Sequence, residues 1–226
     1  MEKFRRELER FVREVYEGDR KVLVFGEGPI GARVMLVGEA PGERESLEGR
    51  PFVGRAGKNL DQFLGGAGIE RGELYITNAV KFRPTRMSKA GGTVNRAPTQ
   101  EEIRLFTPWL LREIGLVKPE CVVTLGNVPL RALTDRQQAI GAVHGRFLEF
   151  PKRPLFAMYH PASLIYNPSL RFAYERDLAV LERRERPART AADITPAPAT
   201  TSPQRSTPTR SRGRSSPRSG MGSSRP

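Results

Sequence analysis

The sequence RVMLVGEAPGERE occupies residues 33–45, and GRPFVG follows it at residues 49–54. The apolar run that opens the first stretch is predicted to be a buried strand. The glycines, alanine and proline that follow end this strand and form a loop of small residues, since Gly and Pro interrupt regular structure. Three carboxylates and one aromatic ring come directly after the strand, at Glu39, Glu43, Glu45 and Phe52. We therefore ask which function would place these residues together after a strand, and use the rest of the sequence to answer.

Short apolar runs and helical patterns alternate along most of the chain. Strands or extended segments are predicted at residues 22–28, 33–40, 74–82, 121–127 and 154–163. Helices are predicted at residues 2–16, 56–68, 99–115, 128–134 and 168–185, and a polar loop is predicted at residues 83–98. Alternating strands and helices, with strands that are apolar on both sides, predict a mostly parallel sheet with helices on both of its faces.

Positive charge is concentrated toward the end of the chain. Of the net charge of +13, residues 186–226 hold +7 and residues 1–185 the remaining +6. From about Pro187 the composition is Ala, Thr, Ser, Pro and Arg with almost no large apolar residue, which predicts disorder. We therefore expect a folded domain at residues 1–186 and a basic, disordered tail at residues 187–226. Both parts are basic, so a polyanionic partner is plausible, although the excess in the body could simply aid solubility.

The chain contains a single cysteine, Cys121, within the apolar run ECVVTLG. One cysteine excludes an intramolecular disulfide and any site made of several cysteines, and this thiol is predicted to be buried and inert. The N-terminal sequence has no apolar signal segment, and no apolar run reaches the roughly 18 residues of a membrane span. We expect a soluble, intracellular protein.

Each of the four core strands is predicted to end in a polar or glycine-rich segment. These segments are GEAPG at 38–42, TN at 77–78, GN at 126–127 and YHPAS at 159–163. Because ligands of open parallel sheets bind beyond the carboxyl ends of the strands, Glu39, Asn78 and His160 should converge. A single His or Asn at a strand end is usually structural, but four such ends in one sheet favour a site.

The chemical types of these residues narrow the function. The Asn78 amide offers donors and an acceptor that suit the edge of a planar base, and Phe52 offers a face for stacking. His160 can donate to an oxygen that gains negative charge, and a carboxylate can orient water or stabilise a cation. No phosphate-loop lysine follows the first glycines, and no HxE with CxxC is present, which argues against a Walker-type loop and a zinc deaminase.

The motifs GEAPG, GRPFVG-x-AG, TNAVK-x-RP, NRAP, VVTLG and YHPAS, in this order, resemble those of the family 4 uracil-DNA glycosylases from about Val22 to Leu181. The resemblance implies a three-layer α/β/α sandwich with a central four-stranded parallel sheet. It also implies hydrolysis of the N-glycosidic bond of deoxyuridine in single- or double-stranded DNA during base-excision repair.

The resemblance further implies a role for each matched residue. Glu39 supports the hydrolytic step and Glu45 joins its polar network, so that both carboxylates face the sugar. Phe52 stacks on the extruded uracil, Asn78 reads the pyrimidine edge, and His160 donates to the uracil O2. Gly38 and Ala40 let the backbone approach the flipped nucleotide, and Asn95 of NRAP is a supporting loop residue.

The chain departs from the family pattern at the cysteines that hold a [4Fe–4S] cluster. The family's CxxC would fall around residues 11–16, its KCRP cysteine is Phe82, and its helix cysteine falls near Phe106. We therefore expect no cluster and no other metal or cofactor, with aromatic packing of Phe82 and Phe106 in its place. The loop at residues 85–94 contains no His, so covalent trapping of the abasic sugar is not expected.

Three readings of the function remain open at this point. The first is a monomeric uracil-DNA glycosylase of the cytoplasm and nucleoid, with a tail that contacts DNA phosphates. The second is a DNA-damage-binding protein on the same fold that has little or no catalytic activity. The third is a small-molecule hydrolase or nucleotide-binding protein, which the absence of phosphate-loop and nucleophile-elbow motifs disfavours.

Overall fold

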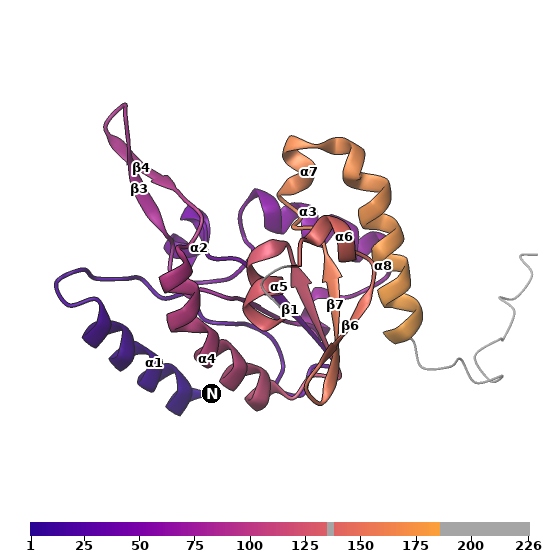
Figure 1. Ribbon diagram of the computed structural model, residues 1–226, viewed down its shortest axis with the longest axis horizontal. Helices are drawn as coiled ribbons and strands as arrows, with labels where there is room; N and C mark the ends of the chain where they lie inside the picture. The colour runs from indigo at the N-terminus through magenta and orange to yellow at the C-terminus, as the bar shows by residue number, and fades with distance from the viewer. Residues whose placement is uncertain (135–137, 186–226) are drawn as a thin grey trace, which may run out of the picture. The chain divides into compact units, whose positions relative to one another are not determined.

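The computed structural model describes residues 1–134 and 138–185. Its helices are α1 (Glu2–Val15), α2 (Glu43–Glu48), α3 (Arg55–Gly66), α4 (Gln100–Val117), α5 (Asn127–Leu133), α6 (Ile140–Val143), α7 (Ser163–Tyr166) and α8 (Arg171–Glu185), with 3-10 turns at Arg71–Glu73 and Pro168–Leu170. Its strands are β1 (Val34–Gly38), β2 (Tyr75–Asn78), β3 (Thr85–Ser88), β4 (Gly92–Asn95), β5 (Cys121–Leu125), β6 (Phe147–Phe150) and β7 (Arg153–Met158) (Figure 1). The predicted tail at residues 187–226 lies outside the described residues, so the predicted domain division stays a prediction.

Within the described residues the central sheet has five strands in the order β2-β1-β5-β7-β6. Strands β2, β1, β5 and β7 are parallel, which confirms the prediction of a mostly parallel sheet. These are the four parallel strands that the resemblance implies, and the structure adds a fifth strand, β6, which pairs antiparallel with β7 at the sheet edge. A tight turn joins these two strands, with Lys152 in the left-handed region at a φ of 69°. An antiparallel neighbour needs only such a turn, whereas parallel neighbours need a crossover.

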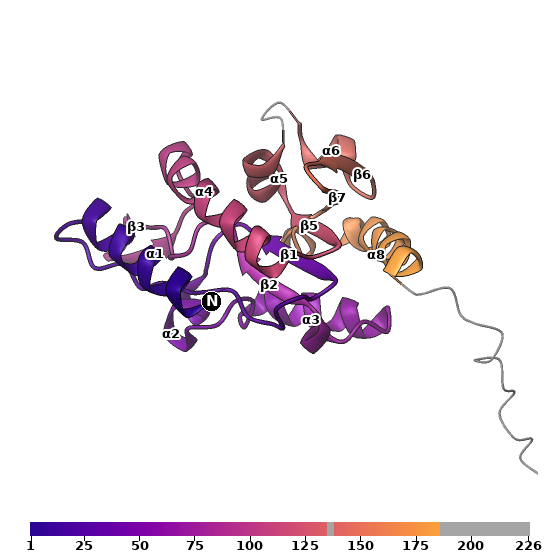
Figure 2. The same ribbon diagram turned by 90° about the horizontal axis from the view of Figure 1, so that it is seen from below.

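Helices cover both faces of the sheet, as predicted (Figure 2). Leu36 of β1 belongs to a core cluster with residues of α3 and α8. Its neighbours Met35 and Val37 belong to a second cluster with residues of α4 and α5. Successive strand residues point to opposite faces, so a strand covered on both sides is apolar throughout. All five residues of β1 are accordingly buried.

Two segments differ in detail from the sequence-based expectation. Residues 22–28 form no strand and instead make isolated bridges from Leu23 to Phe82 and from Glu27 to Ile76. Gly28, at a φ of 132°, lies so close to β2 that a Cβ atom there would be 2.2 Å from the Leu74 carbonyl oxygen. The predicted loop at residues 83–98 contains the antiparallel hairpin β3–β4, which projects beside α2 in Figure 1.

Helix α1 packs along α4, and both figures show the two helices side by side. Phe4, Leu8 and Val12 are buried in a cluster with Phe82 and Phe106. This contact agrees with the predicted amphipathic pattern of α1 and with the predicted packing of the two phenylalanines. In the part of the chain that the structure describes, no helix has both the length and the hydropathy of a membrane span.

Candidate active site

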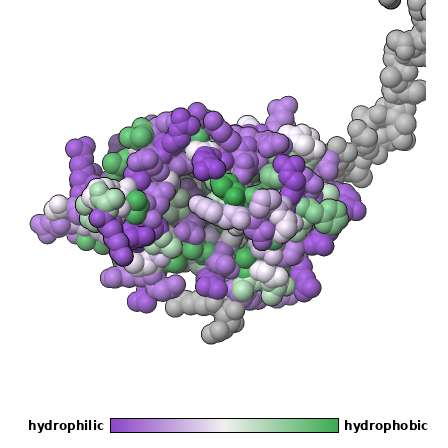
Figure 3. All heavy atoms as spheres, turned by 90° about the horizontal axis from the view of Figure 1, so that it is seen from above, coloured by the Kyte–Doolittle hydropathy of each residue, from purple (hydrophilic) through white to green (hydrophobic). Residues whose placement is uncertain are grey.

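The site is built on the carboxyl ends of the four parallel strands. Asn78 is the last residue of β2 and pairs in register with Gly38, the last residue of β1. Gly126 directly follows β5, and His160 comes two residues after β7. The strand order therefore places Asn78 and His160 on the two outer parallel strands with two glycines between them. Figure 3 shows the side of the molecule that carries α7 and the hairpin, and it is mostly hydrophilic with small hydrophobic areas.

Gly38 is the point at which Asn78 and Phe52 come together. A Cβ atom at Gly38 would lie 2.4 Å from the Asn78 Oδ1 and 2.5 Å from the Phe52 Cζ. Both side chains are buried, with 3% and 5% of their surface exposed. Any residue other than glycine would displace the amide or the ring, so Gly38 acts by having no side chain.

Phe52 has an unusual backbone that its neighbours hold in place. Its φ of 54° lies in the left-handed region, which costs free energy for a bulky residue. The Arg71 guanidinium donates to the Pro51 carbonyl at 2.7 Å and to the Phe52 carbonyl at 3.3 Å. A Cβ atom at Gly57 would lie 1.8 Å from the Phe52 carbonyl oxygen, so α3 must approach closely here. These contacts fix the ring direction of Phe52.

Both carboxylate oxygens of Glu45 accept hydrogen bonds from backbone N–H groups, and the expectation that this carboxylate faces the sugar stays a prediction. Its Oε2 accepts from the Gly42 N–H at 3.1 Å. Its Oε1 accepts from the N–H groups of Val53 and Gly54 at 3.1 and 2.8 Å. The buried carboxylate therefore ties the GEAPG loop to the GRPFVG loop. These bonds hold the backbone that directly follows Phe52.

His160 is held in one tautomer. Its Nδ1 accepts a hydrogen bond from the Ala162 N–H at 3.1 Å, so in the neutral ring the proton is on Nε2. Burial lowers the pKa of His160 to about 4, and the nearby negative charge of Glu45 only partly opposes this shift. The ring lies 5.8 Å from the ring of Phe52, with an angle of 32° between the planes. His160 is thus a neutral Nε2–H donor at neutral pH.

Glu39 is a half-buried carboxylate at the end of β1. Burial raises the pKa of Glu39 above its ordinary value of 4.5. Its main-chain oxygen accepts from the Val80 N–H at 3.0 Å, which fixes the backbone at this position. Ala40, the next residue, packs against the aromatic cluster around Phe82. A desolvated carboxylate of this kind can accept a proton from water.

Asn95 is the one predicted site residue that lies outside this group. It is exposed at the end of β4, and its Oδ1 accepts from the Arg83 Nε at 2.6 Å. Arg83 also pairs with Glu43 of α2 at 3.2 Å. Asn95 therefore anchors the base of the β3–β4 hairpin beside the GEAPG loop, where its Nδ2 would lie 3.7 Å from a Cβ atom at Gly42.

Three residues with a structural link to the site were missed from the sequence. These are Arg71, which holds the Phe52 backbone, and the buried pair Lys81 and Glu113 behind Asn78. The sequence carried a signal for the pair, because Lys81 interrupts the apolar run YITNAVKF and Glu113 lies within the apolar segment WLLREIGLV. It carried none for Arg71, since the 3-10 turn that presents this residue has no distinctive pattern.

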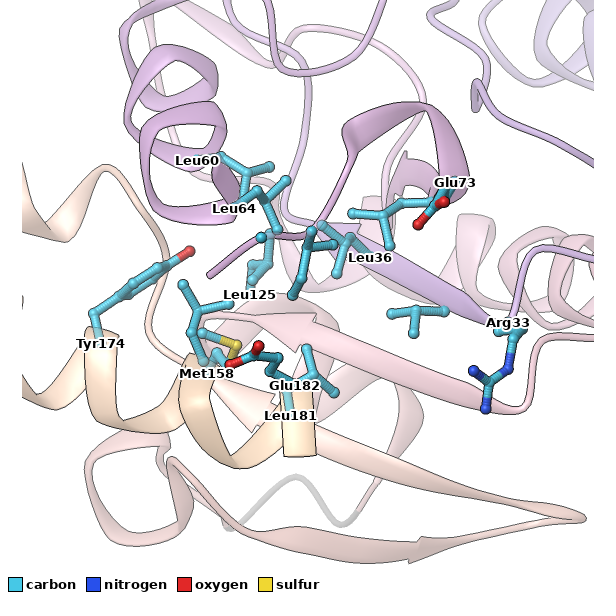
Figure 4. A pocket seen from close by; sticks show the side chains of 15 residues that line it. Arg33, Leu36, Leu60, Leu64, Glu73, Leu125, Met158, Tyr174, Leu181 and Glu182 are labelled. Atoms are coloured by element: carbon cyan, nitrogen blue, oxygen red, sulfur yellow. The ribbon is translucent and has the colours of Figure 1, made fainter. Parts of the chain in front are cut away.

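A cavity of about 400 Å³ lies elsewhere, between α3, α8 and the sheet (Figure 4). Its lining is mainly aliphatic, with Leu60, Leu64, Met158 and Leu181 among the labelled side chains. Its lining includes Leu125 and Met158, the last residues of β5 and β7, but none of Glu39, Phe52, Asn78 and His160. The strand ends therefore remain the candidate site, because polar groups converge there and the cavity has few.

The residues present do not fit a cysteine-ligated cluster. Cys121 is the only cysteine, and it is buried in β5. The positions that the resemblance assigns to ligands hold aromatic side chains that pack together. The ring centroids are 5.6 Å apart for Phe82 and Phe106, 5.3 Å for Tyr16 and Phe82, and 6.4 Å for Phe11 and Phe106. Within the described part of the chain, no group of three or more His, Cys, Asp or Glu side chains could hold a metal ion.

The fold is that of an α/β protein. At the carboxyl edge of its sheet lie the Asn78 amide, the Phe52 ring and the neutral imidazole donor of His160.

Residues 25–182 match the family described as Uracil DNA glycosylase superfamily. The type-4 uracil-DNA glycosylase of Pyrobaculum aerophilum is 38% identical over 169 residues, which are 71% of this chain and 82% of that protein. The type-4 uracil-DNA glycosylase of Sulfurisphaera tokodaii is 40% identical over 163 residues, or 68% and 70% of the two chains. A type-5 uracil-DNA glycosylase of Pyrobaculum aerophilum is 35% identical over 173 residues, or 69% and 72%. This chain belongs to the uracil-DNA glycosylase superfamily, and the resemblance stated from its motifs is confirmed.

Proposed function

We propose that this protein is a uracil-DNA glycosylase that hydrolyses the N-glycosidic bond of deoxyuridine in DNA and leaves an abasic site for base-excision repair. The observation that carries the proposal is the neutral His160 donor beside the Phe52 ring, at the same sheet edge as Asn78. The type-4 relatives, which are 38% and 40% identical to this chain over the matched residues, support it.

Each group has one task in the proposed reaction. Phe52 stacks on the flipped uracil and the Asn78 amide hydrogen-bonds its pyrimidine edge. The bond from C1′ to N1 breaks, and its electron pair leaves with the base, whose O2 accepts a hydrogen bond from the His160 Nε2–H. The oxygen of a water molecule bonds to C1′, and Glu39 takes the proton from that water. The neutral ring already carries its proton on Nε2, where it can donate to the departing anion.

The proposal requires no cofactor. The aromatic cluster of Tyr16, Phe82 and Phe106 gives the site's surroundings a structural support made of side chains. It connects α1 and α4 to Val80, whose N–H donates to the Glu39 carbonyl. Aromatic packing thus occupies the positions at which the resemblance places the cluster cysteines.

DNA is proposed to contact the β3–β4 hairpin. Arg86 and Lys89 are exposed cations on this hairpin, and Met87 is 71% exposed beside them. A two-stranded hairpin that buries little apolar surface is only marginally stable alone, so contact with a partner would contribute to its order. The base of the hairpin is fixed to the loops of the site through Arg83, Asn95 and Glu43. The hairpin is thus placed to bind phosphates near the flipped nucleotide.

The arginine-rich segment at residues 187–226, which lies outside the described residues, is proposed to add phosphate contacts without sequence preference. A monomer acting on chromosomal DNA would work in the cytoplasm at the nucleoid.

The direct test of the function is a cleavage assay on an end-labelled oligonucleotide with one uracil, single-stranded and paired with A or G. Alkali-sensitive cleavage that is lost in Asn78→Ala supports the glycosylase. Specific binding without cleavage would instead support the damage-binding alternative.

A further inference from the structure

Behind Asn78 lies an ion pair from which solvent is excluded. The side chains of Lys81 and Glu113 are both 0% exposed, and the Lys81 Nζ lies 2.5 Å from the Glu113 Oε2. The same Nζ donates to the Thr77 hydroxyl at 2.6 Å and to the Asn78 main-chain carbonyl at 2.6 Å. All three donors of the ammonium group are therefore used, and one of them holds the peptide that follows Asn78.

Glu113 anchors this arrangement to α4. Its Oε1 accepts from the Tyr75 hydroxyl at 3.0 Å, and its Oε2 also accepts from the Thr77 hydroxyl at 3.1 Å. Gly26 closes the other side, since a Cβ atom there would lie 2.6 Å from the Glu113 Oε1. The network is complete, dry and tied to two secondary-structure elements, so it leaves the Asn78 carbonyl little freedom to move.

Stability alone does not explain a buried pair of this kind. Taking both charges out of water costs free energy that the pair recovers only in part, and apolar residues of similar volume are often as stable. Burial lowers the pKa of Lys81, and the charge of Glu113 opposes this effect. The bond to the Asn78 carbonyl needs only an N–H donor, which Lys81 supplies in either protonation state. An apolar residue at position 81 could not supply this hydrogen bond to the Asn78 carbonyl.

We infer that Lys81, braced by Glu113, is a positioning residue that fixes Asn78 and thereby sets the recognition of the pyrimidine edge. This inference rests on the proposed glycosylase function. An error of about 1 Å in the placement of a substrate-contacting group can reduce a rate by on the order of 100-fold. A shift of the Asn78 peptide would move its amide relative to Gly38, where both the amide and the Phe52 ring occupy the space that a side chain would need.

The test is the double variant Lys81→Met/Glu113→Gln. Lys81→Met alone would leave Glu113 charged and unpaired in the core, which is strongly destabilising. With Gln at position 113, the side-chain oxygen can still accept from Tyr75 and the side-chain nitrogen can donate to Thr77, so the main loss is the bond to the Asn78 carbonyl. The matched control is Leu110→Ala, a fully buried position on the same helix that creates a cavity without removing a hydrogen bond to Asn78.

Two readouts are measured at a temperature at which both variants are folded. The first is the single-turnover rate of uracil release, which we expect to fall 10- to 100-fold in the double variant and to stay within threefold of wild type in Leu110→Ala. The second is the NMR signal of the Asn78 side-chain amide, which we expect to shift or broaden only in the double variant. An unchanged signal together with an unchanged rate would overturn the inference. If wild type released no uracil, the proposed function would fail, and the NMR signal would still decide whether Lys81 positions Asn78.

Discussion

Gly38 and Asn78 face each other at the ends of two paired strands, and the space that a side chain at Gly38 would need is filled by the Asn78 amide. The separation of 2.4 Å from a Cβ atom at Gly38 to the Asn78 Oδ1 is far below ordinary contact. The Asn78 side chain at the end of β2 can take its position only because Gly38, at the end of β1, has no side chain.

Gly38→Ala should therefore damage the site more than the fold. We expect uracil release to fall at least about 100-fold, because the methyl group displaces both Asn78 and Phe52. The measurement is single-turnover cleavage, with thermal unfolding recorded in parallel. Gly65→Ala is the control, since a Cβ atom there meets nothing within 4 Å and α3 gains helix propensity. Equal activity in the two variants would refute this account of Gly38.

Arg71→Ala should release the strained backbone of Phe52. The guanidinium bonds to the Pro51 and Phe52 carbonyls are lost, and we expect the unfolding free energy to fall by about 1–2 kcal/mol. We also expect uracil release to slow about 10-fold, as the ring loses its fixed direction. Arg50→Ala removes an exposed bidentate pair with Glu27 and should leave stability almost unchanged. If Arg71→Ala and Arg50→Ala released uracil at the same rate, the hydrogen bonds from Arg71 to the Pro51 and Phe52 carbonyls would have no effect on catalysis.

The pH dependence of the rate should reflect Glu39 and not a titrating histidine. Glu39 must be ionised to take a proton, and its pKa is raised by burial, so the rate should fall as pH drops through a value above 4.5. The pKa of His160 is about 4, so no step is expected near its ordinary value of 6.5. A pH–rate profile of wild type and Glu39→Gln provides the check. The variant should be slower and lack the acid limb, whereas an inflection near pH 6.5 that disappears in His160→Gln would contradict the neutral-donor assignment.

The hairpin proposal predicts a change in salt dependence. Each phosphate contact contributes roughly 0.9 to the slope of log K against log salt on duplex DNA. Arg86→Ala/Lys89→Ala should therefore flatten this slope by about 1.8, while the rate on saturating substrate stays close to wild type. Lys3→Ala/Arg10→Ala removes two exposed cations from α1 and serves as the matched control. Titration of labelled duplex DNA at several salt concentrations measures both slopes, and equal slopes would exclude the hairpin as a phosphate contact.

Phe82→Ala should be strongly destabilising, because this ring is 1% exposed at the centre of the aromatic cluster. We expect a loss of about 3–5 kcal/mol of unfolding free energy, which is typical of such a deletion in a core. Denaturant unfolding measures it, with Phe172→Ala, a ring that is 75% exposed, as the control. If both variants lost the same small amount, the cluster would not be the support that we propose.

Much of this architecture could be read from the sequence, because it depends on local patterns. The apolar runs around Leu36 and Val123 predicted buried parallel strands, and the polar residues at their ends predicted which edge carries the site. The antiparallel strand β6 was missed because a four-residue strand beside a turn carries little periodic signal. The hydrogen bonds of Glu45 could not be predicted from the sequence either. Its partners at Val53 and Gly54 are backbone N–H groups, which meet the carboxylate only in the folded chain.

The most direct test of the central claim is the amount of free uracil released from uracil-containing DNA by the full chain, with the iron content of the same sample determined. Our account predicts stoichiometric release and an abasic site from iron-free protein, and a loss of at least about 100-fold in His160→Ala. Release that depends on bound iron, or that persists in His160→Ala, would contradict it.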